Sequence, residues 1–107
     1  MADIIEITSP AQLRDLLANE LPVLLDFTAQ WCGPCQGLAP VLRDLARDWD
    51  GQLLIAQIDY DTNEDITTEF GVMGLPTLVL YADGEELLRM TGAIAKGELR
   101  RKLTPFL

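Results

Sequence analysis

Histidine is absent from the sequence, cysteine occurs only twice, and basic side chains are few. A structural zinc site normally takes four cysteine or histidine ligands, so this chain could complete one only with carboxylates or with a second chain. Eight basic residues stand against seventeen acidic ones, which gives a net charge of -9. This charge opposes binding to the phosphates of nucleic acids. We therefore expect neither a metal-binding nor a nucleic-acid-binding protein.

Long hydrophobic runs are also missing. No apolar segment approaches the roughly 18 residues that a membrane span requires, and the N-terminal MADIIEITSP has no basic run before an apolar stretch. We therefore expect a cytoplasmic protein that does not associate with membranes. The chain has 107 residues, of which 49% are hydrophobic and 23% charged, as is typical of one globular domain. We predict a single domain over residues 1–107.

Short apolar runs alternate with segments of helical periodicity. Ser9, Pro10 and Gln12 form a helix-start signature, and Asp83-Gly84 is a tight hairpin signal. Helices between the first strands require parallel crossovers, whereas the hairpin adds an antiparallel pair. The pattern predicts an α/β fold, a five-stranded mixed β-sheet flanked by four α-helices. The strands are expected at 4–7, 23–27, 53–58, 77–81 and 87–90. Helices are expected after Ser9, from Pro34 onward, after the cap candidates at 61–63, and around Leu99 and Leu103.

The two cysteines lie in the motif WCGPC, between a buried strand and a helix that Pro34 opens. Three interpretations of Cys32 and Cys35 are open. As a structural disulfide the pair would close a very short loop, worth only about 2 kcal/mol in the chain-entropy model. As a metal site it lacks partners. As a redox pair it has suitable spacing, because positions i and i+3 on a helical turn are close enough for a disulfide.

The redox interpretation assigns different roles to the two thiols. A thiolate is the attacking species, and the positive end of a helix favours it. We expect Cys32, at the start of the helix, to be the exposed nucleophile. Cys35, one turn further and facing the core, is expected to be the resolving thiol.

The motif WCGPC has Asp26 and Phe27 upstream in LLDFTAQWCGPC and GVMGLPTLVLY downstream, and with them it resembles the thioredoxin family along the full length of the chain. The resemblance implies a thioredoxin fold and a protein-disulfide reductase that uses a reversible Cys32–Cys35 disulfide enclosing Gly33 and Pro34. It implies no cofactor beyond this disulfide. The implied partners are a thioredoxin reductase, linked to NADPH or ferredoxin, and disulfide-containing protein substrates. We expect the protein to act as a monomer in electron transport and cell redox homeostasis.

Asp26 interrupts an apolar strand, where a lone carboxylate is unfavourable unless it is paired or protonated. Burial is expected to raise its pKa; the alternative is a solvated strand end. The resemblance implies that Asp26 relays a proton to or from Cys35. Many thioredoxins place a Lys near this acid, but this chain has Gln57. We therefore predict a higher pKa for Asp26 than in relatives that carry the Lys.

The resemblance also implies a substrate-binding surface around the cysteines. Pro76 is expected to be a cis proline that faces them, while the backbone of Leu75 pairs with an extended substrate strand. For Trp31, ordinary core packing is the alternative. Thr28 and Gln36 depart from common family residues and leave partner choice open. The expected surface consists of Trp31, Tyr60, Gly74, Leu75, Thr91, Gly92 and Ala93.

Two other functions compete with a reductase. A secretory oxidase or isomerase is disfavoured because the position before the second cysteine is Pro34 rather than His. A binding module in which the redox chemistry is incidental is the second alternative. The acidic residues Asp59, Asp61, Glu64, Asp65 and Glu69 are interpreted as a solvated face, with docking of a basic partner as the alternative.

Overall fold

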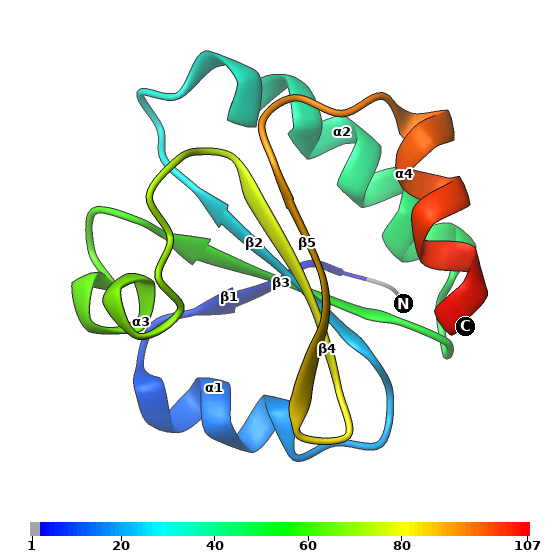
Figure 1. Ribbon diagram of the computed structural model, residues 1–107, viewed down its shortest axis with the longest axis horizontal. Coiled ribbons are helices and arrows are strands. Elements are labelled where there is room, and N and C mark those ends of the chain that lie inside the picture. The colour runs from blue at the N-terminus through cyan, green and yellow to red at the C-terminus, as the bar shows by residue number, and fades with distance from the viewer. Residues whose placement is uncertain (1–2) are drawn as a thin grey trace.

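The computed structural model describes residues 3–107, which form five strands and four helices with one short 3-10 helix (Figure 1). The predicted alternation of strands and helices is confirmed. The elements in chain order are β1 (Ile5–Ile7), α1 (Pro10–Leu17), β2 (Val23–Thr28), α2 (Gly33–Asp48), β3 (Leu54–Asp59), α3 (Glu64–Glu69), β4 (Thr77–Ala82), β5 (Glu85–Thr91), α4 (Lys96–Leu103) and the 3-10 helix Thr104–Phe106.

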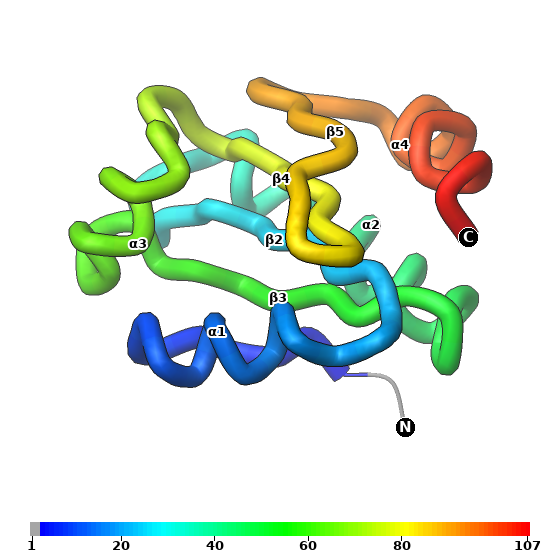
Figure 2. Tube along the Cα trace, turned by 60° about the horizontal axis from the view of Figure 1, so that its bottom comes forward, coloured from blue at the N-terminus to red at the C-terminus, as the bar shows by residue number. Residues whose placement is uncertain are grey.

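The strands form one mixed sheet in the order β1-β3-β2-β4-β5, and Figure 2 shows β3, β2, β4 and β5 stacked in this order. Strands β1 and β2 pair with β3 in parallel, whereas β4 is antiparallel to both β2 and β5. All six residues of the central strand β2 are buried. The β4–β5 turn has positive φ at Asp83 and Gly84, which confirms the hairpin predicted there.

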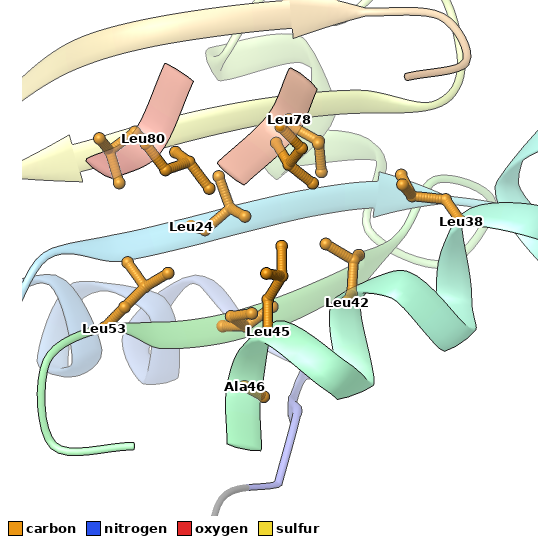
Figure 3. Packing of buried hydrophobic residues seen from close by; sticks show 11 residues of the cluster. Leu24, Leu38, Leu42, Leu45, Ala46, Leu53, Leu78 and Leu80 are labelled. Atoms are coloured by element: carbon orange, nitrogen blue, oxygen red, sulfur yellow. The ribbon is translucent and has the colours of Figure 1, made fainter. Parts of the chain in front are cut away.

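Helices cover both faces of the sheet. The side chains of α1 and α3 pack with Leu25 and Phe27 on one face, and those of α2 and α4 pack with Leu24 on the other. Figure 3 shows the second cluster, where leucines of α2 meet Leu24, Leu78 and Leu80 of the sheet. The burial of both sheet faces explains why the central strands read as continuous apolar runs.

Helix α1 begins as the sequence predicts. The Ser9 hydroxyl accepts a hydrogen bond from the Gln12 backbone N–H at 3.1 Å, while the Gln12 side-chain oxygen accepts from the backbone N–H of Thr8 at 2.7 Å. The last turn of α4 carries three basic residues, whose charge is favourable at the negative end of a helix. In the described part of the chain, none of the helices combines the length and apolar character needed to span a bilayer.

Candidate functional site

The two cysteines lie where β2 passes into α2. Cys32 is the N-cap of α2, and its sulfur accepts a hydrogen bond from the Cys35 backbone N–H at 3.3 Å. A disulfide joins the two residues, whose Cα atoms are 5.3 Å apart, within the range that disulfides normally occupy. Pro34 is tolerated at this end of α2 because the first N–H groups of a helix have no partner within the helix. The predicted placement of the pair on the first helical turn is confirmed.

In the disulfide form both cysteines are buried. Cys32 is 5% exposed and Cys35 is 4% exposed, so the expectation of an exposed Cys32 is wrong for this state. The physical reason is the packing of Ala29, Tyr60 and Leu75 against the pair. Tyr60 and Leu75 come from other segments of the chain, and their contact with the cysteines depends on the tertiary fold.

The loop before β4 and the loop after β5 are held together next to this pair. The Leu75–Pro76 peptide bond is cis, as the resemblance implied. The Gly92 N–H donates to the Pro76 carbonyl at 2.9 Å, and the Thr77 hydroxyl donates to the Gly74 carbonyl at 2.5 Å. The structure thus brings together parts of the predicted surface from two distant segments. Thr77, which directly follows Pro76, was not among the predicted site residues.

Trp31 lies on the surface, which excludes the core alternative for this residue. Its side chain is 67% exposed, and its indole N–H donates to the Asp61 carboxylate at 2.8 Å. Sequence reasoning placed Asp61 on a solvated face and missed this contact, for which no local signal exists because the residues are thirty positions apart. Met73, beside Gly74, is 95% exposed and was also missed, although an apolar side chain before Gly-Leu-Pro was visible in the sequence.

Asp26 is buried within β2 and is not a solvated strand end. It is 6% exposed, and its Oδ1 atom has no hydrogen-bond partner among residues 3–107. Burial, followed by the negative charge of Glu6, raises the pKa of Asp26 from 3.8 to about 7. The expected upward direction is confirmed, and the acid changes charge near neutral pH.

A cavity of about 480 Å³ reaches Asp26 between α2 and the β1 side of the sheet. Gln57 lies directly opposite Asp26 in the β2–β3 register. Cys35 precedes the cavity residue Ala39 by four positions on α2, so the two lie on the same side of the helix. The cavity therefore lies between Asp26 and the helix that carries the redox pair. It is lined by Asp3, Ile4, Asp26, Ala39, Leu42, Arg43, Arg47 and Gln57.

The chemistry available to this arrangement is thiol–disulfide exchange. The disulfide at the N-terminus of α2 packs against Leu75 of the loop before β4, and a buried titratable acid lies on β2, the strand that precedes α2. Among residues 3–107, no group of three or more His, Cys, Asp or Glu side chains could hold a metal ion.

Comparison with known proteins identifies the same family from both the sequence and the structure. The family model described as Thioredoxin matches residues 4–105. The thioredoxin of Pseudomonas aeruginosa is 41% identical over 96 residues, which cover 90% of this chain and 89% of that protein. A thioredoxin structure from Trypanosoma brucei brucei superimposes with a TM-score of 0.90 at 28% identity, covering 98% of this chain and 91% of that chain.

A longer relative carries a similar domain within a larger protein. The bifunctional thioredoxin reductase/thioredoxin of Mycobacterium leprae is 42% identical over 100 residues, which cover 94% of this chain. This chain spans only 22% of that protein's length.

Proposed function

This chain belongs to the thioredoxin family and is a thiol–disulfide oxidoreductase, and from that premise we propose the roles of its residues. Members of the family work through a redox-active disulfide without a cofactor. The observation that carries the proposal is the Cys32–Cys35 disulfide at the start of α2. It joins two thiols of one helical turn beside loops that can contact a partner.

In the reduced protein, the Cys32 thiolate attacks one sulfur of a substrate disulfide, and the other substrate sulfur leaves as a thiolate. The Cys35 thiolate then attacks the Cys32 sulfur and displaces the remaining substrate sulfur. Two electrons and two protons pass in total from the protein dithiol to the substrate. The Cys35 N–H that points to the Cys32 sulfur supports Cys32 as the nucleophile, because this donor favours a thiolate.

We propose that Asp26 accepts the Cys35 proton when the mixed disulfide is resolved, and returns a proton in the reverse direction. Its burial, its unpartnered Oδ1 atom and its pKa of about 7 support this role. A proton-transfer group is most effective when its pKa lies near the working pH. The cavity along α2 supplies the route by which Asp26 exchanges its proton with solvent.

The proposed substrate surface surrounds the disulfide. The half-buried Leu75 presents its backbone to an extended substrate segment, and Pro76 beside it has no N–H. The exposed Trp31 ring supplies apolar contact area at this edge. The residues proposed to contact a substrate are Trp31, Gly33, Pro34, Tyr60, Gly74, Leu75, Pro76, Thr91, Gly92 and Ala93.

A reductase is needed to restore the dithiol. We propose a thioredoxin reductase as this partner and disulfide-containing proteins as substrates, with the chain acting as a cytoplasmic monomer that needs no cofactor beyond its own disulfide. The Mycobacterium leprae relative, whose name joins thioredoxin reductase and thioredoxin, supports the pairing of these two activities.

Trapping of the mixed disulfide tests the assignment of the two thiols. Cys35→Ser is expected to accumulate a covalent complex between Cys32 and a substrate disulfide, seen by mass spectrometry and released by dithiothreitol. The matched variant Cys32→Ser is expected to accumulate none. If Cys32→Ser forms a complex through Cys35 as fast as Cys35→Ser forms one through Cys32, the assignment of Cys32 as the nucleophile is wrong.

The redox potential distinguishes a reductase from a secretory oxidase. We expect a midpoint potential near the roughly -270 mV of a reducing dithiol protein. A value near about -120 mV, which is typical of a strong periplasmic oxidant, would overturn the assignment as a reductase.

A further inference from the structure

Three polar side chains form a row across the parallel half of the sheet. Glu6 of β1 pairs in register with Gln57 of β3, and Gln57 pairs with Asp26 of β2. Their neighbours Ile7 and Phe27 belong to the core on the α1 side. Because side chains alternate along a strand, Glu6, Gln57 and Asp26 project from the other face, toward α2. The row therefore leads from the exposed sheet edge to the buried acid.

Two strand spacings separate the carboxylates at the ends of this row, a distance of about 10 Å. Gln57, between them, carries no charge, so it neither pairs with Asp26 as a cation nor screens Glu6. Glu6 is exposed at the sheet edge, and none of the ion pairs among residues 3–107 involves it. The negative charge of Glu6 therefore acts on Asp26 without a neutralising partner.

The other elements that pack around Asp26 contribute different groups. Helix α2 contributes two cavity-lining cations, Arg43 and Arg47, of which Arg47 pairs with Asp44. The N-terminal segment contributes Asp3 to the same cavity.

The remaining strands and α4 add little charge next to Asp26. Strands β4 and β5 continue the row with the apolar Leu78 and Met90. Lys96 of α4 pairs with Asp44. On β3, the Asp59 carboxylate accepts two backbone N–H groups, and its charge helps to raise the pKa of Glu6. Glu6 is thus the carboxylate in register with Asp26 across the sheet.

We propose that Glu6 is a positioning residue of the disulfide reaction, acting through Asp26: its carboxylate keeps Asp26 protonated over a wider pH range and so sets the pH at which Cys35 resolves the mixed disulfide. This inference rests on the proton relay proposed above for Asp26. Two charges about 10 Å apart, at an effective dielectric constant of about 20 to 80, change a pKa by about 0.3 to 1.

The test compares the Asp26 titration in variants that lose the same charge at different places. The Asp26 titration is monitored by carboxyl NMR in the oxidised protein. Glu6→Gln is expected to lower the pH of its midpoint by about 0.3 to 1. Glu20→Gln removes one negative charge at an exposed position outside the row and is expected to leave the midpoint in place. Glu6→Asp keeps the charge and is expected to restore most of the parent value.

The pH profile of substrate reduction connects the titration to the reaction. Its acid-side midpoint is expected to fall with Glu6→Gln in the parent, and Glu6→Gln is expected to have no effect in an Asp26→Asn background. Suppose that Asp26→Asn removes the pH dependence of the reaction. The Glu6 inference is then overturned if Glu6→Gln shifts neither the Asp26 titration midpoint nor the acid-side midpoint of the rate profile, or shifts them no more than Glu20→Gln does. If Asp26→Asn leaves the profile unchanged, the proton relay itself fails.

Discussion

Replacement of Asp26 by Asn is expected to change stability in a way that depends strongly on pH. Burial, helped by the charge of Glu6, raises the Asp26 pKa from 3.8 to about 7. The folded state therefore holds this proton more tightly than the unfolded state does. The corresponding stabilisation is fully present below pH 3.8 and is lost as the pH rises through about 7.

The pKa difference sets the size of this effect. A difference of about 3 corresponds to about 4 kcal/mol over the whole window, at about 1.36 kcal/mol for each pKa unit. Between pH 5 and pH 9 the parent should lose about 3 kcal/mol through this one group. Asn resembles the protonated acid in shape and stays neutral, so the Asp26→Asn protein avoids that loss.

Guanidinium chloride unfolding of the two oxidised proteins at pH 5, 7 and 9 measures the difference directly. The variant should gain about 3 kcal/mol relative to the parent from pH 5 to pH 9. Asp15→Asn, at an exposed position of α1, serves as the control and should show no such gain. A difference between the Asp26 variant and the parent that stays constant across this range would show that the folded protein does not raise the Asp26 pKa.

Three further substitutions, one of them with a matched glycine control, test the core, the site loop and the surface. Leu45→Ala removes a fully buried side chain of α2 and should cost about 2–5 kcal/mol in chemical unfolding; a loss below about 1 kcal/mol would contradict the packing. Gly92→Ala places a side chain at a φ of +95° and should cost about 1–3 kcal/mol, whereas Gly37→Ala, inside α2 with open space around it, should be neutral or stabilising in the same measurement. Trp31→Phe loses the hydrogen bond to Asp61 and should lower kcat/KM for a protein disulfide while changing the unfolding free energy by less than about 1 kcal/mol; unchanged kinetics would remove Trp31 from the proposed surface.

Much of the fold follows from local patterns. The helix-start residues around Ser9 and the turn at Asp83-Gly84 act through neighbouring backbone groups, so the sequence predicted their places well. Strand β5 extends beyond its apolar run to include Glu85 and Thr91, because an edge strand can form backbone pairs without burying every side chain. The 3-10 helix at Thr104–Phe106 was not predicted, since three residues carry no periodic signal.

The site residues likewise divide into those that local sequence indicates and those that depend on the tertiary fold. The cysteine pair and the acid within an apolar strand were visible as local departures from their surroundings. The burial of Cys32 was not predictable locally, because Tyr60 and Leu75 reach it from other segments. The contact between Trp31 and Asp61 and the row from Glu6 to Asp26 depend on strand order and register, which periodicity alone does not determine.

Reduction of insulin by the purified protein with dithiothreitol is the direct test of electron transfer from the Cys32–Cys35 pair to protein disulfides. The parent should accelerate precipitation of the released insulin chains far above dithiothreitol alone. The Cys32→Ser, Cys35→Ser double variant, confirmed as folded by circular dichroism, should give only the dithiothreitol rate. A parent protein no faster than this double variant would contradict electron transfer by this pair.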